Sequence, residues 1–373
     1  MNGFFGIDLD RKRVFGLDLL RAFAIFCVVH GHGKHYLEDT ALGFLAQIPF
    51  PHGVDIFFVM SGFLIGKSFI SYMEKHDGKV GWPKTLSFYA RTALRIVPNY
   101  LFILLVYYFL VHFQVINGNT QAFPLWRFAT FTQNLFTPFW DFYWESWSLP
   151  TQWWFYILFP LILTLTCRFF KPKKSIPIIC LVFIAISLIF RIVNSNKVTD
   201  SFLWDIWMRR TVASRCDNIY IGVFFAWIRQ YYPELWDRHA VKSLIAGIVL
   251  LVISILIPSE IGSIYSNVVY LTLCALSVAL WFPFFSKIKS YKTKVGAIVS
   301  RISILSYAMF LTNLMVVQII DVNAQNLISL GSVAYFVYWL IVLLFAYLLY
   351  VFVEKPFVKI RENITFAEKL EKE

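Results

Sequence analysis

The chain has 373 residues, of which 58% are hydrophobic, 19% aromatic and only 15% charged. Soluble domains carry about a quarter charged residues, so the composition excludes an ordinary soluble protein and indicates one that crosses a membrane many times. The formal net charge of +12 does not indicate a nucleic-acid-binding protein, because the basic residues follow the alternation of the predicted loops.

We predict an all-α polytopic membrane protein with about ten transmembrane helices. The expected spans are 15–33, 53–72, 96–115, 151–168, 176–193, 213–230, 242–257, 264–285, 301–321 and 332–353. Of the 34 lysines and arginines, 25 fall on one side of these spans and 7 on the other, and Arg21 and Lys67 lie within spans. Five of the seven surround the loop after the fifth span. By the positive-inside rule both termini are cytoplasmic.

We expect one integral domain over residues 1–373, with short cytoplasmic tails at about 1–14 and 355–373. The aromatic stretch at about 116–150 is expected to lie in the outer interface or to fold back into the protein, or else to conceal an eleventh membrane segment.

The first span, in "LLRAFAIFCVVHGHGKHYL", contains Arg21 and, eleven residues later, His32. On an α-helix these side chains share a face, about 16 Å apart along the axis. Charged groups in a span are typical of a polar cavity, although Arg21 can also snorkel or pair while His32 lies at the interface. His30, His32 and His35 invite a metal interpretation, but no nearby carboxylate or cysteine completes a ligand set, so we expect no metal.

The second span opens with "PHGVDIFFVMSGFLIG", which places Asp55 at the same outer depth as His32. A carboxylate beside an imidazole raises its basicity and fixes its tautomer; alternatively, Asp55 caps the helix. Ser61 and Gly62 bring small groups to mid-depth, which permits close helix packing or the approach of a ligand.

On the cytoplasmic side, "FYARTALRIVPNY" puts Arg91 and Arg95 four residues apart on one helical face. Two guanidinium groups so placed suit a phosphate or pyrophosphate, and they equally suit lipid headgroups.

Further polar residues mark the later spans. Arg215 and Asp217 either belong to the site or pair with one another, and Asn313 is either a site residue or an interhelical hydrogen bond. The remaining candidates are Glu145, Trp147, Ser148, Gln152 and Glu354.

Taken in order, these motifs resemble the membrane acyltransferase-3 family, multi-span bacterial enzymes that acylate exported glycans and related acceptors. The family's arginine, ten residues, histidine motif matches Arg21 to His32, and its "GVDxFFVxSGFLI" pattern matches residues 53–65. The other matching elements are the arginines Arg91 and Arg95, "WSL" at 147–149, Arg215 with Asp217 and Gly222, and "EKP" at 354–356. Two positions depart from the family pattern, with Gln152 at a usual glutamate and Asn313 at a usual histidine.

The resemblance implies transfer of an acyl group, by default acetyl, from cytoplasmic acyl-CoA to a hydroxyl of an extracytoplasmic glycan or glycolipid, in the bacterial cytoplasmic membrane. Acyl-CoA is then a co-substrate, and no cofactor is expected. In this hypothesis Arg91 and Arg95 hold the nucleotide, and Arg21 and Ser61 line the path of the pantetheine arm. His32 is the general base, oriented by Asp55, and Ser148, Gln152 or Asn313 stabilises the oxyanion.

Three alternatives remain open on the sequence. The same polar cavity suits a non-enzymatic transporter or flippase for a glycan or an acyl carrier, although we find no two-half symmetry. Gln152 and Asn313 are compatible with a family member that has become a sensor or scaffold. A covalent acyl-His32 is an alternative to base catalysis.

Overall fold

The computed structural model describes residues 13–76, 78, 82–122, 124–257, 260–291 and 293–370. The remainder of the two expected tails, residues 1–12 and 371–373, lies outside the described residues. Across the described ranges the regular structure is helical throughout and contains no strand, which confirms the all-α prediction.

All ten predicted spans are helical. They correspond to α1 (Phe15–Gly33), α3 (Gly53–Lys75), α4 (Trp82–His112), α6 (Ser148–Thr166), α7 (Pro172–Asn194), α9 (Val212–Tyr231), α11 (Ala240–Leu256), α12 (Tyr270–Ala279), α14 (Lys294–Asn323) and α16 (Ser332–Leu349). Eight helical stretches in the described chain are long and apolar enough to cross a membrane. The other two spans are α11, which has only 17 residues, and α9, which carries Arg215, Asp217 and Arg229.

Short helices connect or extend these spans. They are η2 (Lys34–Leu37), α2 (Gly43–Ala46), α5 (Leu125–Ala129), η3 (Trp144–Trp147), η4 (Ser195–Lys197), α8 (Ser201–Trp204), η5 (Asp205–Arg209), α10 (Pro233–Arg238), η6 (Tyr265–Val269), α13 (Phe282–Phe285), α15 (Gln325–Ile328), η7 (Tyr350–Glu354) and α17 (Lys355–Leu370). Three of them, η5, η6 and η7, are π-helical.

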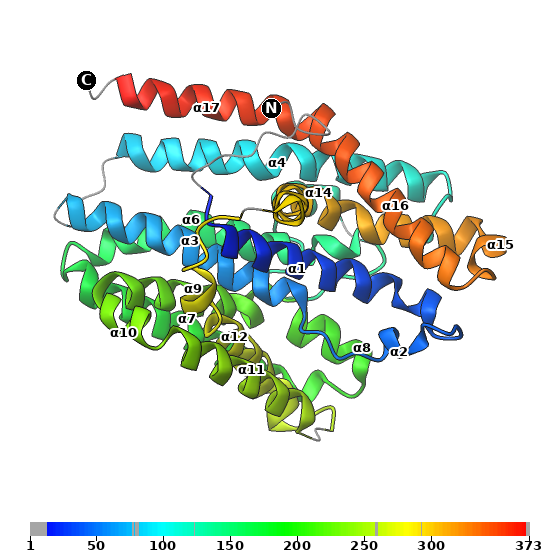
Figure 1. Cartoon of the computed structure of the whole chain (residues 1–373), viewed down its shortest axis with the longest axis horizontal. Helices are drawn as coiled ribbons and strands as arrows, with labels where there is room; N and C mark the ends of the chain where they lie inside the picture. Colours follow the sequence, from blue (N-terminus) through cyan, green and yellow to red (C-terminus); the bar gives the residue numbers. More distant parts are fainter. Residues whose placement is uncertain are drawn as a thin grey trace.

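The helix α9 lies against α3 on one side and α7 on the other (Figure 1). Glycines allow the first of these contacts, because a Cβ on Gly62 would lie 1.8 Å from the carbonyl oxygen of Ile219, and one on Gly222 would lie 2.1 Å from that of Val59. Real Cβ atoms cannot approach so closely, so any larger residue would force the helices apart. The expected packing role of Gly62 is therefore confirmed.

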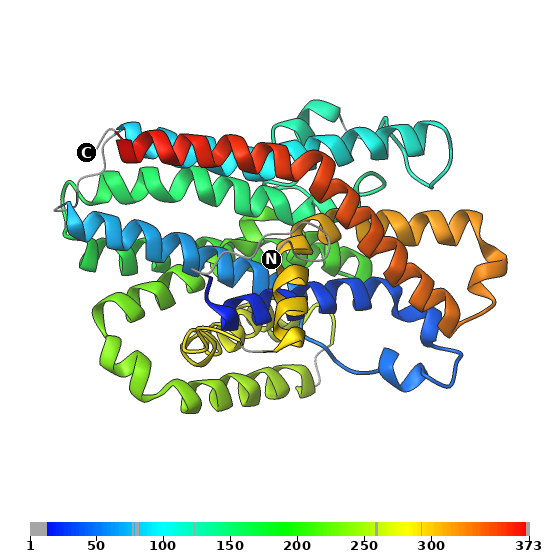
Figure 2. The ribbon, with the colours of Figure 1, turned by 45° about the horizontal axis from the view of Figure 1, so that its top comes forward.

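The helix α1 packs against both α3 and α14, which places the first predicted site helix at the centre of the bundle (Figure 1). At the other end of the chain α17 runs beside α4 (Figure 2). Residues from 355 onward, expected as a tail, thus continue α16 through η7 as a helix as far as Leu370.

The aromatic stretch at 116–150 folds back into the protein. Before α6 begins at Ser148, its described residues form only the short helices α5 and η3, and Phe128, Phe131 and Tyr143 are at most 1% exposed. A further membrane-spanning helix is therefore excluded for the described part of this stretch.

Candidate active site

A cavity of about 90 Å³ brings five of the predicted site residues together. It lies between α1, α3, α4, α6 and α14, and the predicted residues in its lining are Arg21, Ser61, Arg95, Ser148 and Gln152. Tyr156 and Tyr307 contribute further polar groups to the wall. Arg21 and Gln152, which are 131 positions apart in the sequence, thus share one internal space, as a common site requires.

Small neutral groups meet at mid-depth in this cavity. The Tyr156 hydroxyl lies 3.2 Å from Ser61 Oγ and 3.3 Å from Gln152 Oε1, and the Ser61 hydroxyl donates to Gln152 Oε1 over 3.4 Å. Gln152 here acts through its carbonyl oxygen, as an acceptor, which is a role that the family's usual glutamate can also fill.

Arg21 lines this cavity, as expected for a polar cavity rather than a lipid-facing position. Its Nη1 lies 3.8 Å from Oδ1 of Asp18, one turn earlier on α1. Asp18 also pairs with Arg13 and accepts a hydrogen bond of 2.8 Å from Ser303. This arrangement compensates the buried positive charge at the inner end of α1.

A second cavity, of about 530 Å³, opens between α3 and the first turns of α4 and shares Leu64 with the first. Its basic lining residues are Lys67, Lys75, Lys84 and Arg91. Arg91 therefore faces a different cavity from Arg95, although the two residues share a helical face. None of the three lysines carries a motif in the sequence: Lys75 and Lys84 fall in a predicted cytoplasmic loop, and Lys67 falls within the second predicted span.

At the outer end of α1, meaning the end predicted to face away from the cytoplasm, the His32 ring is hydrogen-bonded to the side chain of Asn313 on α14. The contact joins His32 Nδ1 to Asn313 Oδ1. Asn313 is fully buried, whereas His32 remains partly accessible.

The hydrogen bonds of Asn313 fix the tautomer of His32. The Asn313 amide nitrogen donates to the backbone carbonyls of Met309 (3.0 Å) and Phe310 (2.7 Å), so its oxygen faces the ring and accepts. His32 Nδ1 must then carry the proton, which leaves the lone pair on Nε2 available as a base. Phe310, one turn before Asn313 on α14, lines the inner cavity.

The expected contact between His32 and Asp55 is replaced by a different one. Asp55 is 1% exposed and forms an ion pair with Arg215 of α9, and it accepts a hydrogen bond of 3.1 Å from Asn218. Asp55 and His32 share a depth, but their partners lie on different helices. Arg215 and Asp217, expected as alternative partners of each other, also pair elsewhere.

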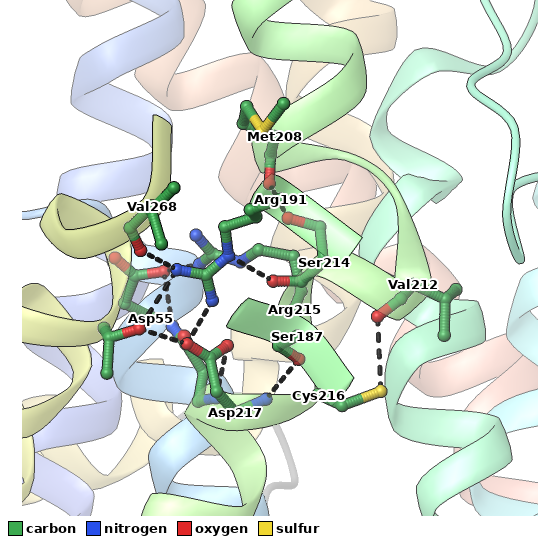
Figure 3. Close-up of polar contacts among 12 residues, drawn as sticks. Asp55, Ser187, Arg191, Met208, Val212, Ser214, Arg215, Cys216, Asp217 and Val268 are labelled. Atoms are coloured by element: carbon green, nitrogen blue, oxygen red, sulfur yellow. Dashed lines mark hydrogen bonds and ion pairs between the residues drawn. The ribbon is translucent and has the colours of Figure 1, made fainter. Parts of the chain in front are cut away.

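Asp217 pairs with Arg191 of α7, and both side chains are completely buried. Figure 3 shows these residues converging with Asp55 and Arg215 in one polar cluster. Arg191 also donates to the carbonyls of Ser214 (3.0 Å) and Val268 (2.6 Å), so one guanidinium joins α7 and α9 to the π-helix η6. Arg191, which was not predicted as a site residue, is the centre of this structural cluster.

The two remaining carboxylates also join helices. Glu145 accepts a hydrogen bond of 3.0 Å from Tyr107 of α4, and Glu354 accepts one of 3.0 Å from Asn99, beside the proline in α4. Trp147 packs edge-on against Phe58 of α3, with 6.0 Å between the ring centroids.

The histidines flanking His32 have separate partners. His30 Nδ1 bonds to the Tyr335 hydroxyl at 2.9 Å, and His35 Nε2 lies 3.3 Å from Asp321. Within the described residues no group of three or more His, Cys, Asp or Glu side chains is placed to hold a metal ion.

Comparison with known protein families shows the family to which the chain belongs. The model of a family described as an acyltransferase domain matches residues 14–353. The chain belongs to this acyltransferase-3 family. The match includes every site residue discussed above except Glu354, and the eight long apolar helices make this family member a multi-pass membrane protein.

Curated relatives are distant. The chain is similar to the O-acetyltransferase OatA of Staphylococcus aureus strain NCTC 8325 / PS 47, with 27% identity over 242 residues, which cover 61% of this chain and 35% of the relative. It is also similar to a putative O-acetyltransferase of strain COL, with 25% identity over 379 residues, covering 92% of this chain and 57% of the relative. The chain thus spans between about a third and just over half of these relatives' lengths. No solved structure matches the chain.

Proposed function

We propose that this acyltransferase moves an acetyl group from cytoplasmic acetyl-CoA to a hydroxyl of a glycan or lipid-linked sugar on the outer side of a bacterial cytoplasmic membrane. The observation that carries the proposal is the His32 ring, which Asn313 orients at the outer end of α1, the same helix whose Arg21 lines the inner cavity. The family and the names of its relatives support O-acetyl transfer over the transport of an intact substrate.

The two cavities suggest how the donor lies. The larger one, with its four basic residues, suits the phosphates of the nucleotide end. The smaller one is narrow and suits a flexible chain, so the pantetheine arm would pass Leu64 and run between α1, α3 and α6. Its thioester then approaches His32 from the cytoplasmic side, whereas the acceptor approaches from the opposite side.

In the proposed reaction His32 Nε2 removes the proton from the acceptor hydroxyl while the oxygen attacks the thioester carbonyl carbon. The tetrahedral intermediate collapses with cleavage of the carbon–sulfur bond. The sulfur leaves with the proton held by the imidazolium, giving an ester and free CoA. Ser148 and Gln152, two of the neutral polar residues in the cavity, are proposed to stabilise the oxyanion.

Replacing Asn313 by alanine should lower kcat about tenfold to a hundredfold with little change in the KM for acetyl-CoA, because the His32 ring loses the acceptor that fixes its tautomer. Asn313→His, which restores the usual family residue, should retain more activity than Asn313→Ala. Steady-state kinetics of the purified variants measure both. An Asn313→Ala variant with unchanged kcat would show that another group orients His32.

Arg91→Ala should weaken acetyl-CoA binding about tenfold, since one charge-assisted phosphate contact is lost. Because salt screens such contacts, affinity should fall more steeply with ionic strength in the wild type than in the variant. Calorimetric titration with acetyl-CoA measures this, and Lys287→Ala is the control, being exposed and outside the cavity. Equal affinities and salt slopes in the wild type and Arg91→Ala would reduce Arg91 to a topology determinant.

A further inference from the structure

The outer loop before α9 breaks the charge bias of the chain. The other outer loops together hold two of the seven basic residues predicted outside, and the other five surround this loop. Two of the five, Arg191 and Arg215, are buried in the ion pairs described above, and Lys197 lies 3.9 Å over the ring of Trp207. Arg209 and Arg210 remain to be explained, because topology alone disfavours them here.

The two arginines are held side by side by one carboxylate. Asp205 pairs with Nε of Arg209 through Oδ1 and with Nε of Arg210 through Oδ2. The pKa of Asp205 is raised by burial, but the two guanidinium groups outweigh this effect and hold it below its ordinary value. Burial lowers the pKa of Arg210 to about 10, so Asp205 and Arg210 are both charged near neutral pH.

These ion pairs use the Nε atoms and leave the Nη atoms of both guanidinium groups available. Among the described residues no hydrogen bond engages an Nη atom of Arg209 or Arg210. The guanidinium groups lie over tryptophan rings, Arg209 at 5.6 Å from the Trp147 centroid and Arg210 at 4.6 Å from that of Trp144. Side-chain exposures of 22% for Arg209 and 14% for Arg210 keep both partly accessible.

A buried asparagine fixes the arginines to the tryptophans. Asn134 is 0% exposed, and its amide nitrogen donates to the backbone carbonyls of Trp147 (2.7 Å) and Arg210 (2.6 Å). The backbone carbonyl of Asn134 in turn accepts from the amide of Val212, at the start of α9 (2.9 Å). The loop that carries the arginines is therefore built into the protein and is not a loose surface segment.

The same charged groups interact with His32. Arg209, Arg210 and Asp205 all act electrostatically on its ring, and Arg209 and Asp205 also act on His52, just before α3. Glu145 is a further neighbour of Arg210, but it is 2% exposed and directed to Tyr107 in the core. On the accessible side the charged groups are thus two guanidinium groups and one carboxylate, which leaves an excess of positive charge.

We propose that Arg209 and Arg210, backed by Trp144 and Trp147, bind an anionic group of the acceptor beside His32. The acceptor is then a sugar that carries a carboxylate or a phosphate near the hydroxyl to be acylated. The planar guanidinium forks suit such oxyanions, and the tryptophan rings beneath them help to hold the two guanidinium groups in place. This inference rests on the proposed function, because it treats the bound sugar as the acceptor of the acyl group. Binding of an anionic sugar can nevertheless be measured without turnover.

The test is equilibrium binding of methyl β-D-glucuronide, glucose 1-phosphate and the neutral methyl β-D-glucoside to the purified full chain in detergent. We expect the wild type to bind at least one anionic probe more tightly than the neutral one, with the better probe identifying the source of the charge. Arg209→Ala and Arg210→Ala should each weaken that binding about tenfold or more. The control Lys197→Ala, in the same loop, should leave it unchanged, and retained acetyl-CoA binding shows that the variants are folded.

Equal binding of neutral and anionic sugars, no binding of any probe, or unchanged affinity in both arginine variants would overturn the inference. Failure of the proposed function has a different signature. In that case the wild type binds the anionic sugar through Arg209 and Arg210, yet no acetyl group is transferred to any acceptor.

Discussion

Replacing His32 by alanine is expected to lower the rate of acyl transfer about 10²- to 10⁴-fold, the usual contribution of a general base. The variant should remain folded and inserted, because His32 is only partly buried and its partner Asn313 keeps its own hydrogen bonds to the backbone. Binding of acetyl-CoA should change little, since the proposed donor contacts lie in the two inner cavities. Initial rates with purified protein at saturating donor measure the effect.

The neighbouring histidines supply matched controls. His35 is exposed beside Asp321, so His35→Ala should stay close to wild-type activity. His30 is buried against Tyr335, so His30→Ala should lower thermal stability more than turnover per folded molecule. Equal losses of turnover in all three variants, with a metal found in the purified protein, would replace the general-base proposal by a metal site.

Arg215→Met is expected to destabilise the protein strongly. It leaves the Asp55 carboxylate buried without its cation, and breaking one side of a buried ion pair costs about 3–5 kcal/mol. The double variant Asp55→Leu with Arg215→Met should recover much of the stability, because a well-packed apolar pair avoids the desolvation cost. Thermal unfolding in detergent, followed by intrinsic tryptophan fluorescence, reports both changes.

The double variant also decides between two roles for Asp55. If Asp55 is structural, as its contacts with Arg215 and Asn218 indicate, turnover per folded molecule should stay within about tenfold of wild type. A double variant that is stable but as inactive as His32→Ala would return Asp55 to the catalytic role expected from the sequence.

The helices and a polar cavity between them can be predicted from the sequence, because hydropathy and charge bias define the spans and the depth of each residue in the membrane. Depth does not define direction around the helix axis. Asp55 and His32 both lie at outer helix ends, and only the packing of α9 against α3 turns Asp55 toward Arg215. The sequence marks Asn313 as a departure from the family pattern and as a candidate for the oxyanion or for an interhelical hydrogen bond, and its position on α14 makes it the hydrogen-bond partner of His32.

The spacing of Arg91 and Arg95 likewise does not determine whether they line the same cavity. Four residues keep two side chains on one face but separate them by about 6 Å along the axis, which is enough to place them in two adjoining cavities. Arg209 and Arg210 carried no motif at all. The one sequence signal that pointed to them was an excess of basic residues on the side where the charge bias disfavours them.

Acyl transfer across the membrane is tested most directly by following a labelled acetyl group. Inside-out vesicles from bacteria producing the protein expose its cytoplasmic face and enclose native glycans. With acetyl-CoA labelled in the acetyl group added outside, we expect ester-linked label on the enclosed glycans for the wild type, and a loss of about a hundredfold or more for His32→Ala. Absence of covalent label in wild-type vesicles, or equal labelling with wild type and His32→Ala, would contradict the account.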